Sequence, residues 1–167
     1  MIVNKDGDLL KAKYCMAIVH QTNCLGVMGA GIARQIKNKW FDNIYEPYRK
    51  TCLNFSNKKE LLGKIQVLKT NDEPIRYVIN VFGEYSFTES ECQFPNGRHT
   101  DYDALFQCLN KVKTWCIEHN VGNIGMPKNL GCGLAGGDWN GVVYPMIQKI
   151  FGEDEKITLF IYNFSPK

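Results

Sequence analysis

Two glycine-rich turns constrain the fold of this chain more than any other feature of its sequence. The first runs from Asn23 to Ala33 and the second from Asn129 to Trp139. Each follows a short apolar run typical of a buried strand and leads into a segment typical of a helix. Glycine lets backbone N–H groups approach a phosphate closely, and a helix N-terminus adds unpaired N–H groups and a positive dipole end. The turns therefore predict a ligand with two phosphates, or one phosphate held from both sides.

The remaining periodicity predicts strands that alternate with helices. Strands are expected over residues 15–20, 64–69, 76–82, 121–126 and 157–164, and the second and third of these form a hairpin. Helices are expected over 29–40, 45–53, 100–119 with Thr100 as N-cap, and from 138 or 139 to about 152. This alternation indicates a mixed α/β sheet covered on both faces. Ligands of such sheets lie at the carboxyl ends of the strands, where both turns fall.

Length and composition limit the class of protein. The chain has 167 residues, which fits a single domain over 1–167, and its net charge of +3 suits an anionic small molecule. Seven cysteines, an odd number without a CxxC pair, indicate free thiols and a cytoplasmic protein. Cys92 and His99 lack companion ligands, so no metal and no cofactor are expected. No signal peptide or membrane-spanning run is evident.

The turns do not match the common nucleotide-binding motifs. Neither contains the lysine and Ser/Thr of a Walker A loop, and Gly29-Ala30-Gly31 is not followed by the last glycine of a GxGxxG motif. A GxSxG nucleophile elbow is missing as well. These absences count against nucleotide triphosphate hydrolysis, hydride transfer and serine hydrolase chemistry.

Several segments, taken in order, resemble a known family. They are Gly7-Asp8-Leu9-Leu10, Ile18 to Asn23, Gly29 to Ala33, Met126-Pro127-Lys128 leading to Gly131-Cys132-Gly133-Leu134, and Phe160-Ile161-Tyr162. Together they resemble the macrodomains, α/β modules that bind ADP-ribose, over nearly the whole chain. The resemblance implies a three-layer α/β/α sandwich with a mixed central sheet.

Within that family the chain most resembles the stand-alone ADP-ribose-1″-phosphate phosphatases of the yeast and phage type. The pointers are His20, the segment 61–64, and Phe82-Gly83 followed by Thr100-Asp101-Tyr102. This resemblance implies a monomeric enzyme that hydrolyses ADP-ribose 1″-phosphate to ADP-ribose and phosphate. Two alternatives stay open: a hydrolase that removes ADP-ribose from protein or nucleic acid, and a non-catalytic reader of ADP-ribose.

The resemblance also implies roles for individual residues. Asp8 would accept a hydrogen bond from the adenine amino group, and Tyr162 would pack on adenine, unless the register places Phe160 there. The turn 26–33 would surround the distal ribose and one phosphate, and 131–135 the second phosphate. The residues expected to contact ADP-ribose are Asp8, Leu9, Gly26, Met28, Gly29, Ala30, Gly31, Ile32, Asn129, Gly131, Cys132, Gly133, Leu134, Ala135, Tyr162 and Asn163.

His20, Asn23 and Asp138 are the candidate catalytic residues. His20 is expected at the end of its strand, where an imidazole suits proton transfer or phosphate contact; alternatively it is a hydrogen-bonded structural histidine. Asn23 would contact the distal ribose. Asp138 is either a water-positioning carboxylate or a helix N-cap.

Two further features bear on the chemistry. Arg98 and His99 either clamp a terminal phosphate or are solvated. The lysine and aspartate used by related ADP-ribosyl-glutamate hydrolases are replaced by Val81 or Phe82 and by Ala135, which argues against that mechanism.

Overall fold

The structure, a computed structural model, describes residues 1–164, so the last three residues of the expected domain lie outside the described residues. One six-stranded sheet runs through the molecule in the order β1-β6-β5-β2-β4-β3. Its strands are β1 Ile2–Asp6, β2 Ala17–Thr22, β3 Ile65–Lys69, β4 Tyr77–Phe82, β5 Asn123–Pro127 and β6 Thr158–Asn163. All neighbours pair in parallel except β3 and β4, which form the predicted antiparallel hairpin.

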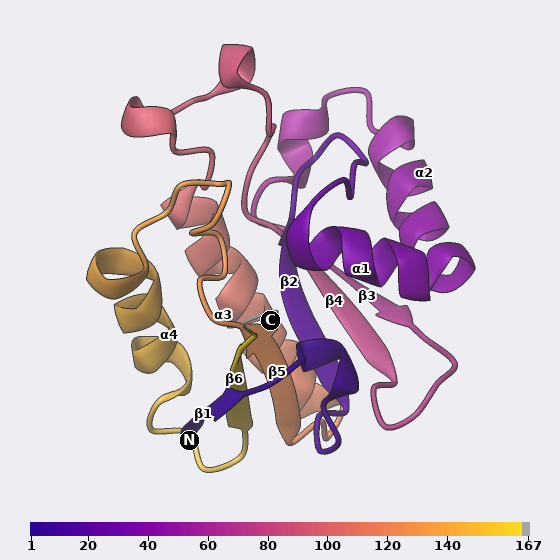
Figure 1. The fold of residues 1–167 in the computed structure, drawn as a ribbon, viewed down its shortest axis with the longest axis vertical. Helices are drawn as coiled ribbons and strands as arrows, with labels where there is room; N and C mark the ends of the chain where they lie inside the picture. Colours follow the sequence, from indigo (N-terminus) through magenta and orange to yellow (C-terminus); the bar gives the residue numbers. More distant parts are fainter. Residues whose placement is uncertain (165–167) are drawn as a thin grey trace.

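Helices cover both faces of this sheet (Figure 1). On one side lie α1 Gly31–Lys39 and α2 Glu46–Asn54, joined by a π-helical turn, Phe41–Tyr45. On the other side lie α3 Tyr102–Glu118 and α4 Tyr144–Phe151, the latter preceded by a π-helical turn, Trp139–Val143. The predicted three-layer α/β/α sandwich is therefore confirmed.

Strand alternation divides the interior into two cores. In β2, Ala17 and Val19 pack with α3 and α4, whereas Ile18 packs with α1 and α2. Both faces of the central strands are apolar because helices cover both, which is why the sequence shows short continuous apolar runs. The carboxyl ends of β2, β4, β5 and β6 meet at one edge. The chain leaves β2 toward β4 and later returns to β5 on the other side, so this edge is a topological switch point.

The predicted cap of α3 is wrong by one residue. Asp101, not Thr100, is the N-cap, and its carboxylate accepts a hydrogen bond from the Ala104 N–H at 3.0 Å. The Thr100 hydroxyl instead donates to the Gly131 carbonyl at 2.6 Å. Thr100 is thus used to attach the second glycine-rich turn to the start of α3.

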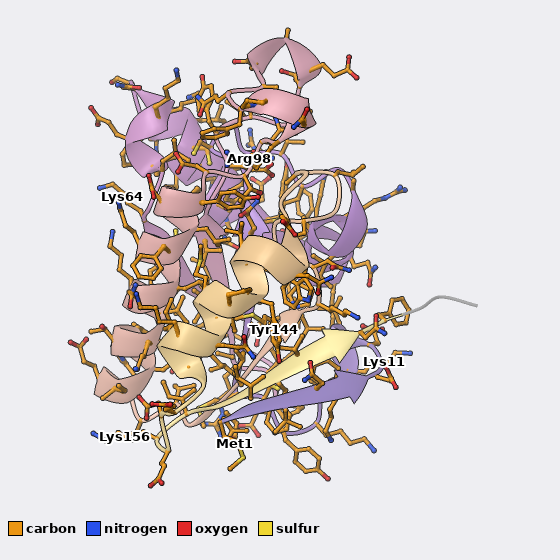
Figure 2. The ribbon with its side chains drawn as sticks, turned by 90° about the vertical axis from the view of Figure 1, so that its left-hand side faces the viewer. Met1, Lys11, Lys64, Arg98, Tyr144 and Lys156 are labelled. Carbon is orange, nitrogen blue, oxygen red and sulfur yellow. The ribbon has the colours of Figure 1, made fainter. Side chains whose placement is uncertain are left out.

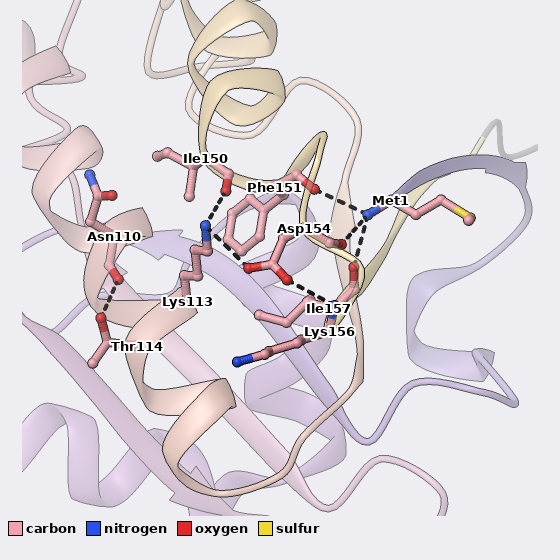
Figure 3. A network of polar contacts seen from close by, with 9 residues as sticks. All are labelled: Met1, Asn110, Lys113, Thr114, Ile150, Phe151, Asp154, Lys156 and Ile157. Carbon is pink, nitrogen blue, oxygen red and sulfur yellow. Dashed lines mark hydrogen bonds and ion pairs between the residues drawn. The ribbon is translucent and has the colours of Figure 1, made fainter.

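At the end of the molecule away from Arg98, Met1 connects several elements by hydrogen bonds (Figures 2 and 3). Its ammonium group donates to the carbonyl oxygens of Phe151, Asp154 and Ile157 at 3.1, 2.8 and 2.9 Å. Lys113 of α3 donates to the Ile150 carbonyl and pairs with the Asp154 carboxylate at 3.2 Å. These contacts tie α3, α4 and the edge strand β1 together at this end.

The other composition-based expectations concern thiols, metals and membranes. All seven cysteines are free. Within residues 1–164, no three His, Cys, Asp or Glu side chains are grouped so that they could hold a metal ion. Among the described helices, none has the length and apolar character needed to cross a membrane. The cytoplasmic location stays a prediction.

Candidate functional site

A cleft of about 1110 Å³ lies at the carboxyl edge of the sheet. It exceeds the size of most small-molecule pockets, about 300–1000 Å³, and suits a ligand as large as a dinucleotide. The glycine-rich turns form two of its walls, and the segment after β6 forms its end. Of the residues predicted to contact ligand, those that line it are Asp8, Leu9, Asn23, Gly29, Ala30, Gly31, Ile32, Asn129, Gly131, Gly133, Leu134, Ala135, Tyr162 and Asn163.

Asn23 organises the first turn. Its side-chain oxygen accepts from the N–H groups of Leu25 and Val27 at 3.0 and 3.3 Å, and its amide nitrogen donates to the Val27 carbonyl at 2.8 Å. The buried Tyr48 hydroxyl lies 2.8 Å from the Asn23 carbonyl oxygen and 2.9 Å from its side-chain oxygen. The Asn23 amide is therefore engaged chiefly in shaping the turn, which leaves a catalytic role without structural support.

The start of α1 supplies hydrogen-bond donors to the same wall. The N-cap Ala30 has an extended backbone and no side chain that could accept from the first turn. The N–H groups of Gly31, Ile32 and Ala33 have no acceptor within the helix, because the first helical hydrogen bond runs from Arg34 to the Ala30 carbonyl at 3.2 Å. No acidic residue lies in this turn. An anion in the cleft can therefore meet several free donors and the positive end of the helix dipole.

The second turn presents a separate set of donors. Gly131 adopts a φ of 71°, and its carbonyl accepts from the Gly137 N–H and the Thr100 hydroxyl, which fixes the base of the turn. The Gln21 amide donates to the same hydroxyl at 2.9 Å and connects the turn to β2. The Cys132 N–H donates to the Asn129 carbonyl, but the three N–H groups that follow, at residues 133–135, have no acceptor in the described part of the chain. They are free to bind a second anionic group.

The far end of the cleft is apolar with one carboxylate. Leu9 and Tyr162 are buried there, and the Tyr162 ring lies against Gly7, where an added Cβ would be 3.9 Å from it. Phe160 does not line the cleft and lies beneath the Lys5 ammonium group. Asp8 caps the short helical turn after it by accepting from the Leu10 N–H at 2.9 Å, and it also faces the cleft. Tyr162 rather than Phe160 is the aromatic side chain available to a ligand.

The placement of His20 at the ligand edge is wrong. Strand β2 continues two residues beyond it, to Thr22, so His20 lies inside the sheet and is fully buried on the face covered by α1 and α2. Its Nε2–H donates to the Asn80 side-chain oxygen at 2.6 Å. Burial lowers the pKa of the imidazole to about 4. His20 is a neutral structural histidine and does not reach the cleft.

Asp138 also lies outside the cleft. Its carboxylate caps the turn that leads into α4 by accepting from the Gly141 N–H at 3.0 Å, so the N-cap alternative describes its position.

Three predicted contact residues do not line the cleft either, each for a local reason. Gly26 faces α2, with an added Cβ 3.4 Å from that of Cys52. Met28 is buried in the core beside α1, and the Cys132 thiol turns back to the Leu130 carbonyl at 3.3 Å.

Arg98 and His99 separate in the structure. The Arg98 guanidinium lies 4.0 Å from the ring centroids of both Phe94 and Tyr102 and donates to the Thr100 carbonyl at 2.7 Å. It is therefore used to hold its own loop. His99 lines the cleft.

Sequence reasoning missed Glu84 and the adjacent strand residues Gln21 and Thr22, all of which line the cleft. Glu84 is half-buried, and burial raises the pKa of its carboxyl to about 7. It follows β4 by two residues, so its position after a buried strand was a usable signal. The long irregular segment 83–99 concealed it, because no periodicity shows which of its residues turn inward.

Comparison with known proteins gives consistent results. A sequence profile of the Macro domain family matches residues 19–145. The DNA ADP-ribosyl glycohydrolase of Mycobacterium tuberculosis is 31% identical over 144 residues, which are 85% of this chain but only 36% of that protein. Human ADP-ribose glycohydrolase OARD1 is 28% identical over 155 residues, 92% of this chain and 87% of that protein. Among solved structures, the macrodomain of Mycobacterium tuberculosis DarG superposes with a TM-score of 0.80 at 26% identity, covering 100% of this chain and 99% of that one.

Proposed function

The chain belongs to the macrodomain family, and we propose that it binds ADP-ribose and hydrolyses the bond that joins ADP-ribose to a macromolecular carrier, DNA or protein. The observation that carries this proposal is the presence of free backbone donors on both walls of one cleft, at the start of α1 and at residues 133–135. Two separate donor sets suit the two phosphates of ADP-ribose. Tyr162 and Leu9 would pack on the adenine, and Asp8 would accept from its amino group.

The nature of the carrier is supported by the relatives. The relatives named above are described as glycohydrolases that act on ADP-ribose, in one case on DNA. These descriptions favour a carrier over a small phosphate ester.

The narrower expectation, hydrolysis of ADP-ribose 1″-phosphate, has lost its main structural argument. It depended on His20 reaching the terminal phosphate, and His20 is buried behind the sheet. The phosphate ester therefore serves as a comparison substrate in the test rather than as the proposed one.

The test measures release of ADP-ribose from ADP-ribosylated DNA and ADP-ribosylated protein, beside phosphate release from ADP-ribose 1″-phosphate. We expect turnover of at least one carrier. Gly133 offers a matched pair of variants, because an added Cβ meets nothing within 4 Å. G133D places a carboxylate among the donors and should reduce ADP-ribose affinity at least about tenfold more than the neutral G133N. Binding without turnover of either carrier would indicate a reader and overturn the proposal.

A further inference from the structure

Glu84 lines the cleft, and its backbone is held in place there. Its backbone pairs with Thr100 in an antiparallel bridge, and its carbonyl accepts from the Cys24 thiol at 3.4 Å. The carbonyl of the preceding Gly83 accepts from the Asp101 N–H at 2.7 Å. The Asn23 turn and the start of α3 therefore fix the backbone of this cleft-lining residue from two sides.

The Glu84 carboxyl group has no partner among residues 1–164. Neither a hydrogen bond nor an ion pair reaches it there, in contrast to Glu46, Glu73 and Glu91, which contact an arginine or hydroxyl groups. Burial alone raises its pKa to about 7. A carboxylate that is largely removed from water is normally paired with a donor or a cation. An unpaired one that lines a cleft is therefore available to a ligand.

The sheet order places Glu84 at the end of the cleft opposite Tyr162. Tyr162 belongs to β6 and Glu84 follows β4, and these strands are separated by β5 and β2. Three steps between adjacent strands amount to about 14 Å. A ligand that packs its adenine on Tyr162 and spans the two donor sets thus brings its distal ribose toward Glu84.

The other titratable groups on the cleft are less suitable for proton transfer at that ribose. Asp8 lies at the adenine end and is engaged as a cap. Glu89 and Cys92 belong to the outer loop, Lys128 follows β5, and His99 precedes α3. Of these side chains, only Glu84 combines a fixed position beside the Asn23 turn with an unpaired carboxyl group.

We propose that Glu84 is the catalytic residue that transfers the proton during release of ADP-ribose, an inference that rests on the proposed function. As a carboxylate it takes a proton from a water molecule while the water oxygen bonds to C1″ of the distal ribose. The bond from C1″ to the carrier breaks, and its electron pair goes to the carrier atom. That atom takes the proton from Glu84, which regenerates the carboxylate and gives ADP-ribose and free carrier.

The test compares wild type, E84Q and E91Q in single-turnover release and in calorimetric binding of ADP-ribose. General base catalysis is worth about 10²–10⁴-fold, so E84Q should lose at least about 100-fold in rate while binding ADP-ribose within a few-fold of wild type. Glu91 lies in the same loop outside the cleft, and its Oε1 accepts from Ser86 and Thr88, a role that glutamine retains. E91Q should react like wild type and controls for the lost charge.

The pH dependence gives a second readout. The wild-type rate should rise with pH to a plateau above about 7, because the ionised carboxylate is the active form. This inflection should disappear in E84Q and persist in H99Q, which removes the imidazole that lines the same cleft. If E84Q retains the wild-type rate, or if the inflection is lost with His99 instead, the role of Glu84 is wrong while the proposed function stands. If wild type releases ADP-ribose from no carrier, both are wrong.

Discussion

His20 begins a line of polar side chains under α2, in which His20 and Asn80 are buried and Gln66 and Thr51 are half-buried. Its Nε2–H donates to Asn80 Oδ1, Asn80 Nδ2 donates to Gln66 Oε1 at 3.1 Å, and Gln66 Nε2 donates to Thr51 Oγ1 at 2.9 Å. The second ring nitrogen, Nδ1, has no partner in the described residues. Each member of this line fixes the orientation of the next, and only the neutral imidazole can be accommodated without an uncompensated buried charge.

This arrangement makes the fold sensitive to acid through His20. The folded pKa is about 4 against an ordinary value of 6.5, so the unfolded state binds more protons between these values. The contribution of neutral His20 to the free energy of unfolding is fully present above about pH 6.5. It is lost as the pH falls toward 4, and the total loss is about 3 kcal/mol. H20Q keeps an N–H donor and does not titrate. Denaturant unfolding from pH 4 to 7 should therefore show a smaller loss for H20Q than for wild type, and parallel curves would contradict this account.

Glu84 acts on stability in the opposite direction. Its folded pKa of about 7 lies above its ordinary value of 4.5, so it favours the fold below about pH 4.5 and this contribution is lost as the pH rises through 7. Because Glu84 is present in both wild type and H20Q, its contribution cancels when the free energies of unfolding of the two proteins are subtracted at each pH.

At the scale of elements, the start of α1 is built for a ligand rather than for stability. Ala30 occupies the N-cap with φ −150° and ψ 160°, an extended conformation that serine or aspartate also adopts. Either side chain would satisfy N–H groups that are now free, and stabilise the helix by about 1 kcal/mol. An alanine at this position leaves the donors to an anion in the cleft.

Substitution of Ala30 should therefore trade binding for stability. A30S and A30D should each raise the free energy of unfolding by about 1 kcal/mol in a urea titration. A30D should weaken ADP-ribose binding at least about tenfold relative to A30S, because its carboxylate repels the phosphate that the donors attract. If both variants are stabilised and bind like wild type in calorimetry, the start of α1 does not hold a phosphate.

The elements themselves could largely be predicted from the sequence, but not their ends. Apolar runs located β2 and β4 because helices cover both faces, and the two glycine-rich turns located the cleft edge. The end of β2 was placed two residues too early, which moved His20 from the core to the edge. Periodicity does not show where a strand ends when polar residues such as Gln21 and Thr22 continue it. The predicted N-cap role of Thr100 was wrong for another reason: its hydroxyl bonds to the Gly131 carbonyl, 31 residues away, and no local pattern shows such a partner.

For the whole molecule, the cleft is the place where the two halves of the sheet meet. One donor set belongs to α1, which packs in the core with α2, and the other belongs to the turn beside α3. At the opposite end of the molecule, the hydrogen bonds of the Met1 ammonium group connect the elements (Figure 3). At the cleft edge, a bound ligand could make such a connection. A ligand that contacts both donor sets cross-links the halves, whereas one that contacts a single wall does not.

ADP-ribose should therefore stabilise the molecule and protect both walls together. At 100 times its Kd a ligand contributes about 2.7 kcal/mol to the free energy of unfolding, which corresponds to a rise in Tm of about 5–10 °C for a chain of this size. Amide exchange should slow at residues 29–33 and at 133–135, with AMP at equal saturation protecting fewer of these amides because it carries one phosphate. G133D, with at least about tenfold weaker binding, should reduce the rise in Tm to about half or less at the same ADP-ribose concentration. Protection confined to one wall under saturating ADP-ribose would mean that the two turns do not share a ligand.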